Sequence, residues 1–357
     1  MSRGTDKRRG FRSALAEMSH DLRIFLKWTG ISVLCGLPVG LVGAVFHHLV
    51  EEATLFREEH RWIIWLLPAA GVLIAWLYRA AGMETDGGTN TVLSSVRSEK
   101  ELRFRTAPLI FAGTVLTHLF GGSAGREGAA LQLGGSIGAQ LGRWLRLDSR
   151  DRHIITLCGM SACFAALFGT PLTAAFFAME VVSVGLMYYT AIVPCLFSAL
   201  IGAGIAGQLG AVPTSFSVGE IPALSLASAA QAAGMGILCA GVSILFCTAI
   251  HMTGHQMKKL LPNSLVRAAA GGALVAAAAF LLGTTDYNGA GMDVVARALA
   301  GEARPEAFLL KILFTAVTLG AGFRGGEIVP VFFAGATFGC AAGPLLGLPA
   351  GFGGALG

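Results

Sequence analysis

Most of this chain consists of apolar segments separated by short polar or glycine-rich stretches. An apolar segment of about 17–25 residues is long enough to cross a bilayer as a helix. Residues 11–25 predict a short amphipathic helix at the membrane interface. We predict further apolar helices at 28–48, 62–78, 106–120, 154–168, 186–209, 226–251, 264–282 and 306–319. The pattern therefore predicts an all-α polytopic membrane protein.

Composition and charge agree with a membrane protein. The 357 residues are 54% apolar and 13% charged, with a mean hydropathy of +0.67, whereas soluble domains carry roughly a quarter charged residues. The net charge of +5 gathers in loops and at the N-terminus, which argues against a nucleic-acid partner. The basic residues 1–12 lack the apolar core of a signal peptide. We expect a multi-pass protein of the cell's inner (plasma) membrane with a cytoplasmic N-terminus.

Nothing in the sequence predicts a metal ion or a cofactor. The seven cysteines lie singly in apolar runs without a C-x-x-C pair, which is typical of small core residues. His47, His48, Glu51 and Glu52 imitate a metal cluster at helical spacing. No further ligands converge there in sequence, so we interpret them as a solvated helix end.

The stretch 121–138, GGSAGREGAALQLGGSIG, carries the most distinctive chemistry. Arg126 and Glu127 stand between glycines inside an apolar chain, and an ionisable residue at membrane depth predicts a functional site. The glycine turn leads into a helix, whose N-terminal N–H groups attract anions. We predict an anion held by the backbone around Gly125–Gly128, with Glu127 beside it. The alternative is a structural Arg126–Glu127 ion pair, although neighbours on a helix point apart.

Two other stretches carry weaker signals. Gly87–Asn90 is a turn before a short helix, which predicts either a second anion-facing N-terminus or an ordinary helix cap. Glu180 ends the apolar face of the helix that Pro171 opens, either as an interfacial residue or as part of a proton route.

The chain also contains an internal repeat. A shift of 200 residues places Gly122 on Gly322, Gly125 on Gly325, Glu127 on Glu327 and Gly135 on Gly335. We divide the chain into an N-terminal region at 1–25, a first membrane repeat at 26–210, a linker at 211–224 and a second repeat at 225–357. The counterpart of the helix at Pro171 falls near position 371, so we expect either a fragment or an abbreviated second half. Duplicated halves with broken helices that converge at mid-membrane are a known transporter architecture.

GSAGREGA, GTPLTAAFFAMEV and GFRGGEIVPVFF together resemble the CLC chloride channel and transporter superfamily. Gly125–Gly128 is similar to its G-K/R-E-G-P element, with Ala129 in place of proline. THLFGGSAGREG and the glutamate of the third motif resemble the bacterial fluoride-exporting branch more than the chloride branch. The resemblance implies an inverted repeat, a homodimer, and halide and proton as the transported species.

The resemblance also implies roles for single residues. Glu127 is the expected gate, which occupies the anion site when ionised and leaves it when protonated or displaced. Exchangers of the family carry an internal glutamate at the place of Val181, so Glu327 is the expected substitute proton carrier. The family's pore tyrosine falls beyond Gly357. The expected anion-binding residues are Thr89, Asn90, Gly125, Arg126, Gly128, Ile328 and Val329.

Several functions stay open at this point. Fluoride/proton antiport is the first hypothesis, and a passive chloride channel or chloride/proton exchanger of the same fold is the second. An intramembrane hydrolase is a remote third, because Ser161 stands in a turn-like GMSA and needs a partner such as His118. A fragment without transport activity is the fourth. We expect no enzyme.

Overall fold

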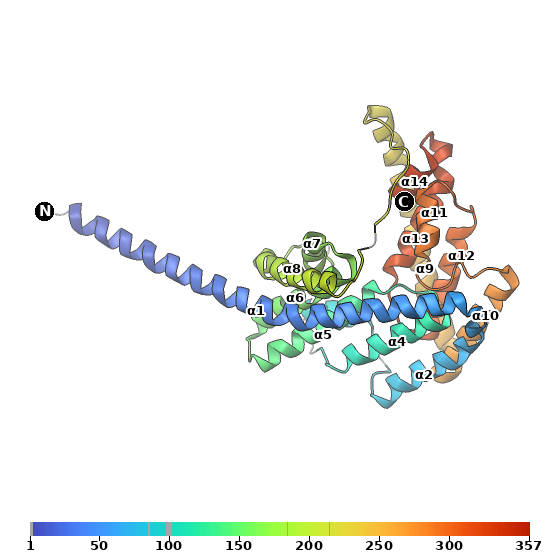
Figure 1. The fold of residues 1–357 in the computed structure, drawn as a ribbon, viewed down its shortest axis with the longest axis horizontal. Coiled ribbons are helices and arrows are strands. Elements are labelled where there is room, and N and C mark those ends of the chain that lie inside the picture. Colours follow the sequence, from blue (N-terminus) through green and yellow to red (C-terminus); the bar gives the residue numbers. More distant parts are fainter. Residues whose placement is uncertain (1–2, 85, 98–101, 184, 214) are drawn as a thin grey trace.

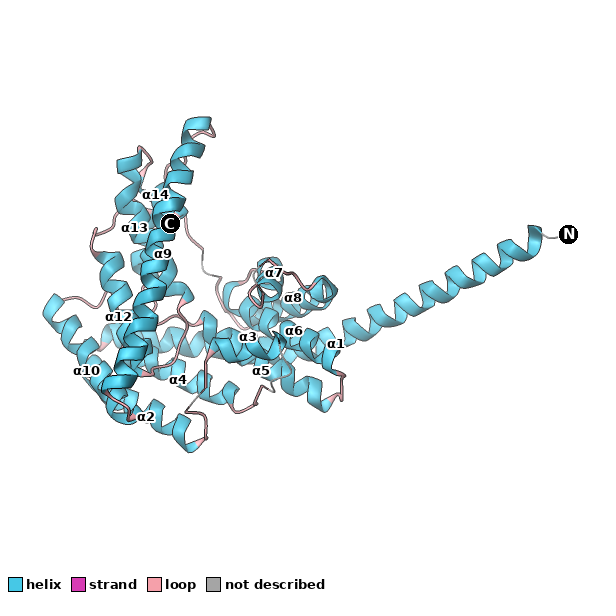
Figure 2. Ribbon diagram, turned by 180° about the vertical axis from the view of Figure 1, so that it is seen from behind, coloured by secondary structure: helices cyan, strands magenta, loops and turns pink. Residues whose placement is uncertain are grey.

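The computed structural model describes residues 3–84, 86–97, 102–183, 185–213 and 215–357. Across these residues the protein is helical, and an isolated bridge between Gly125 and Gly326 is the one β-type pairing. Residues 226–357 gather on one side of the molecule, and α1 (Arg3–Glu59) projects its N-terminus far from the other side (Figures 1 and 2).

Among the described residues, ten helical elements precede the predicted linker at 211–224 and seven follow it. The first set comprises α1, η1 (Arg61–Leu66), α2 (Leu67–Ala80), α3 (Thr89–Arg97), α4 (Thr106–Phe120), α5 (Glu127–Trp144), α6 (Ser149–Phe168), α7 (Pro171–Glu180), η2 (Tyr189–Ala191) and α8 (Ile192–Gln208). The second set comprises α9 (Leu226–Leu260), α10 (Ser264–Leu282), α11 (Met292–Leu299), α12 (Ala307–Ala321), α13 (Ile328–Ala342), η3 (Gly343–Leu346) and α14 (Ala350–Leu356).

Six of the described helices are long and apolar enough to cross a membrane. They are Glu17–Glu59, Arg61–Ala80, Tyr189–Gln208, Leu226–Leu260, Ser264–Leu282 and Ile328–Leu346. The helices α4 and α12 are apolar but have only 15 residues each. Helices too short to span are what a fold with broken helices requires.

The bounds of α4 and α10 agree with the sequence prediction, but the start of the chain differs from it. One continuous helix, α1, runs through the predicted interfacial helix at 11–25 and the predicted span at 28–48. Residues 11–29 contain no glycine or proline to interrupt the helix, and Pro38 lies inside it without ending it. The separate interfacial helix is therefore not seen.

The two halves repeat each other with a shift of 201, so the predicted shift of 200 is wrong by one residue. The starts of α4 and α12 differ by 201 positions, as do those of α5 and α13. Reciprocal hydrogen bonds follow the same register: Ser123 N donates to Thr318 Oγ1 at 3.1 Å, and Arg324 N donates to Thr117 Oγ1 at 3.3 Å.

This register changes which charged residues correspond. Glu127 matches Ile328, and Glu327 matches Arg126, so the two glutamates are not repeats of each other. The error arose because glycines are so frequent that both shifts produce identities. The shift of 201 aligns Gly121 with Gly322, Gly125 with Gly326, Gly134 with Gly335, Gly138 with Gly339, and Gly142 with Gly343.

Glycines also let the helices after each loop pack closely. An added methyl group at Gly134 would collide with the backbone of Gly159 in α6, and one at Gly339 would collide with Gly353 in α14. Small residues of this kind permit close helix approach in membranes. Five of the seven cysteines are buried in these packed regions, as predicted, while Cys239 is half-buried and Cys247 is exposed.

Candidate functional site

The two glycine loops meet in the middle of the protein. Gly125 N donates to Gly326 O, and Gly326 N donates to Gly125 O, both at 2.7 Å. A methyl group added at Gly326 would lie 2.6 Å from the backbone N of Gly128, so this approach requires glycine. The bridge sets the N-termini of α5 and α13 beside each other, with their free N–H groups in one place.

The Glu127 carboxylate lies at this meeting point. Its side chain is 1% exposed and folds back so closely that a methyl group at Gly125 would collide with Oε2. The backbone amides of Arg126, Glu127 and Val329 face the carboxylate, and the last belongs to the other repeat. Oε2 itself makes no hydrogen bond of good geometry. An acidic side chain therefore occupies the position that two helix N-termini prepare for an anion.

Two cavities end at residues 126–128, and they share no lining residue. The first, of about 520 Å³, reaches Arg126 and Glu127, and we call it the Glu127 cavity. The second, of about 420 Å³, reaches Gly128 and is lined by 322–328, and we call it the Glu327 cavity. Residues 126–128 therefore separate two spaces, as a closed gate does.

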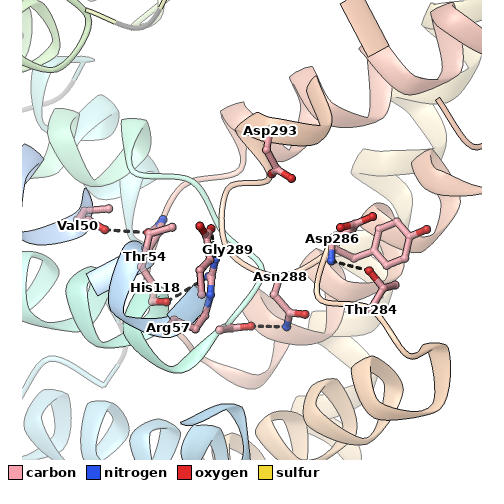
Figure 3. Close-up of polar contacts among 12 residues, drawn as sticks. Val50, Thr54, Arg57, His118, Thr284, Asp286, Asn288, Gly289 and Asp293 are labelled. Atoms are coloured by element: carbon pink, nitrogen blue, oxygen red, sulfur yellow. Dashed lines mark hydrogen bonds and ion pairs between the residues drawn. The ribbon is translucent and has the colours of Figure 1, made fainter. Parts of the chain in front are cut away.

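Polar contacts tie the wall of the Glu127 cavity together across the repeats (Figure 3). Asn288 Nδ2 donates to Gly121 O at 2.6 Å, and the buried Arg57 Nη1 donates to His118 O at 3.3 Å. Arg57 and His118 lie on one side in Figure 3, with Asn288 and Asp293 on the other. The loop before α11 is thus held against the end of α4.

A buried lysine supports the same loop from behind. Lys311 of α12 is fully buried, and its Nζ donates to Gly289 O at 2.7 Å and Tyr287 O at 3.3 Å. Its ammonium also lies 4.9 Å from the centre of the Phe333 ring, a cation–π distance. Sequence reasoning missed Lys311, although a lone lysine in an apolar helix was a visible signal.

The Glu327 cavity contains most of the other predicted site residues. Thr89 Oγ1 donates to Gly128 O at 3.4 Å, so α3 contacts the start of α5 directly. Gln132, which sequence reasoning missed, donates from Nε2 to Thr89 Oγ1 and Gly128 O, both at 3.2 Å. Glu327 and Asn90 are exposed, and both line this cavity.

A second missed group lies in the same cavity. Arg324 Nη1 is 3.9 Å from Asp86 Oδ2, and its guanidinium lies 3.6 Å from the centre of the Tyr78 ring. The Asp86 side chain is 1% exposed and that of Arg324 is 17% exposed. This cluster joins the loop before α3 to the loop before α13.

The structure thus brings together part of the predicted site and divides the rest. Glu127 lies with Gly125 and the Val329 amide, and Arg126 faces the Glu127 cavity. Ile328 and Glu327 line the other cavity, so the two predicted glutamates face different spaces. Thr89 joins the site through Gly128, whereas Asn90 is related to it only by the shared cavity.

Two other sequence interpretations are tested by burial and contacts. Ser161 is buried and its Oγ donates to Cys195 O at 3.1 Å, while His118 Nδ1 contacts Thr114 O of its own helix at 2.9 Å. These contacts give no support to a hydrolase pair. His47 is 3% exposed, so the solvated helix end is wrong for His47, although Glu51 and Glu52 are exposed.

The comparisons with known proteins agree with this architecture. A "Chloride/fluoride channel protein" of Pseudomonas syringae pv. tomato is 39% identical over 332 residues, which cover 91% of this chain and 74% of that protein. An "H(+)/Cl(-) exchange transporter" of Cronobacter sakazakii is 25% identical over 367 residues, covering 95% and 78%. These relatives are named as a channel and a transporter, not as enzymes.

A solved structure and a family profile give the same result. The crystal structure of a "CLC-type fluoride/proton antiporter" superposes with a TM-score of 0.88 at 32% identity, covering 92% of this chain and 84% of that one. The profile described as "Voltage gated chloride channel" matches residues 70–357. The inverted repeat, the paired helix N-termini and these matches have one explanation: the chain is a multi-pass membrane protein that belongs to the voltage gated chloride channel (CLC) family.

Proposed function

We propose that this protein exports fluoride across the membrane in exchange for protons. The observation that carries the proposal is the Glu127 carboxylate, buried against the amides of both repeats at the point where two cavities end. Fluoride is favoured over chloride by the similarity to a protein named a chloride/fluoride channel and to a structure of a fluoride/proton antiporter.

In this mechanism, Glu127 is both the gate and a proton carrier. The ionised carboxylate occupies the amide-lined position and blocks the anion. A proton neutralises the carboxylate, which then loses its attraction to the helix N-termini and leaves. An anion takes its place, because aligned amide dipoles replace the water that the anion sheds.

The other predicted residues act on either side of this gate. Gly125, Gly128 and Val329 provide backbone close to the carboxylate, and Arg126 faces the Glu127 cavity. In the Glu327 cavity, Thr89, Asn90 and Ile328 line the route of the anion, and the exposed Glu327 carries the proton. Fluoride is small and strongly hydrated, so a route rich in hydrogen-bond donors favours it, and the Asn90 amide lines this cavity.

The distribution of charge along the chain supports a cytoplasmic N-terminus. Lys27 of α1 contacts Asp151 beside the basic turn at 143–152, on the side opposite Glu51 and Glu52. Basic turns stay in the cytoplasm, so the Glu127 cavity faces outward and the Glu327 cavity inward. The family resemblance also leads us to expect a homodimer, and the molecular mass of the purified protein in detergent tests this expectation.

A passive chloride channel is the second candidate. It is favoured by Val181, which lines the Glu327 cavity where exchangers of the family carry an internal glutamate. In that case anion movement does not depend on protons, and Glu327 has no role in coupling.

Liposomes that contain the purified protein separate the two candidates. Efflux of fluoride and of chloride is measured with ion-selective electrodes, with and without an opposing pH gradient. Fluoride efflux that drives proton uptake, with uptake abolished in Glu127→Gln, is the expected result. Chloride flux that is indifferent to pH contradicts antiport and supports the channel.

A further inference from the structure

His47 near the end of α1 lines the Glu127 cavity but has no part in the anion route described above. Its ring is buried, with 3% of the residue exposed, and neither Nδ1 nor Nε2 makes a hydrogen bond. A buried polar atom without a partner is unusual in a folded protein and requires an explanation. The same cavity contains the Glu127 carboxylate, whose Oε2 also makes no hydrogen bond.

The second ring nitrogen of His47, Nε2, contacts a side chain that is exposed to solution. Nε2 lies 3.3 Å from Oε2 of Glu51, one helical turn further along α1. The Glu51 side chain is 53% exposed, so water reaches it directly. An exposed carboxylate, a buried imidazole and a buried carboxylate therefore line one cavity.

The surroundings of His47 are mixed in charge. Arg126, directly before α5, faces the ring, and Glu51 and His48 face it from its own helix. The rest of the cavity wall carries Arg57, Glu58, Arg61, His118, Asp286 and Asp293. With about 520 Å³ of space and many polar groups, the cavity is large enough to hold several waters between His47 and Glu127.

We propose that Glu51 and His47 deliver protons from solution to Glu127. This inference rests on the proposed antiport function and extends it to the entry of the proton. A proton binds the Glu51 carboxylate and passes to Nε2 of His47, and the proton on Nδ1 leaves for the Glu127 carboxylate through cavity water. The ring then exchanges its tautomer. One proton enters, one leaves, and no other bond changes.

His118 lines the same cavity but does not offer such a route. Its Nδ1 is held by Thr114 O at 2.9 Å, and its backbone carbonyl accepts from Arg57. Like that of His47, its Nε2 makes no hydrogen bond, but His118 lacks an exposed carboxylate such as Glu51, which lies 3.3 Å from His47. The connection to solution distinguishes His47.

The test compares His47→Gln and Glu51→Gln with His48→Gln and Glu52→Gln in liposomes loaded with fluoride. The control residues are the sequence neighbours: His48 Nε2 contacts Leu209 O at 3.0 Å, Glu52 is exposed, and neither lines the cavity. We expect fluoride-driven proton uptake to fall roughly tenfold in His47→Gln, below the full effect of a positioned acid–base group. Glu51→Gln reduces it less, and both controls match the wild type.

Imidazole buffer separates a relay from a structural role. Added on the side of the Glu127 cavity, it is expected to restore proton uptake in His47→Gln, because a small acid replaces the missing ring. Wild-type uptake in His47→Gln, or a loss that imidazole does not restore, overturns the inference. If His47→Gln does not fold, Glu51→Gln decides, since its exposed side chain is not needed for packing.

The same experiment keeps the two proposals apart. A wild-type protein that moves fluoride without protons contradicts antiport itself. A coupled wild type with an equally coupled His47→Gln contradicts only the relay.

Discussion

Gly125 and Gly326 exchange two backbone hydrogen bonds of 2.7 Å and so join the two halves of the protein at its centre. The residues correspond to each other in the repeat, so the pair lies on the axis that relates the halves. Helices α5 and α13 begin two residues after these glycines. The pair therefore places the backbone amides that face Glu127. The anion site is therefore formed by backbone amides of both halves, and neither half forms it alone.

Gly326→Ala tests this junction. Its new methyl group would lie 2.6 Å from Gly128 N, which forces the loops apart. We expect a destabilisation of about 1–3 kcal/mol and a loss of fluoride flux. Gly204→Ala in α8 is the control, because nothing lies within 4 Å of the added methyl. Thermal unfolding in detergent measures both, and equal melting temperatures would show that the junction tolerates a side chain.

Gln132 is expected to set the affinity for the anion on the side of the Glu327 cavity. Gln132→Leu keeps the bulk but removes the donor to Thr89 Oγ1 and Gly128 O. Each of the two lost hydrogen bonds is worth about 1 kcal/mol, and a loss of about 1 kcal/mol in anion binding corresponds to a roughly fivefold weaker apparent affinity. The fluoride concentration dependence of efflux measures it. Gln140→Leu, in the same helix but bonded to Arg143, is the control, and an equal shift in both variants rules out a specific role.

The sequence predicted the elements better than the relations between them. Strong local signals, such as Gly121 after an apolar run, placed the end of α4 correctly. The predicted shift between the two repeats was wrong by one residue, because glycine identities alone do not define the register. Reciprocal hydrogen bonds such as Ser123–Thr318 do define it. The burial of His47 and the pairing of Asp86 with Arg324 depend on distant helices, so no local pattern indicated them.

Arg324 and Asp86 are expected to stabilise the protein as a pair. Arg324→Gln leaves the buried Asp86 carboxylate without its counter-charge. Breaking a buried pair costs about 3–5 kcal/mol, and we expect the low end because Arg324 keeps some exposure. The double variant with Asp86→Asn should recover part of this loss. A double-mutant cycle of unfolding measures the coupling, and additive effects would contradict a pair.

Glu327→Gln tests whether one transport cycle needs two separate carboxylates. Glu327 is exposed in its cavity and corresponds to Arg126, not to the gate, so its loss leaves the amides around Glu127 intact. We therefore expect fluoride movement to persist while the number of protons moved per fluoride falls toward zero. Simultaneous fluoride and pH recordings from the same liposomes give this ratio, and Glu327→Asp, which keeps the carboxylate, should retain coupling. A Glu327→Gln protein with the wild-type ratio means that another group of that cavity carries the proton, and Asp86, whose Oδ2 is buried without a hydrogen bond, is then the next residue to replace.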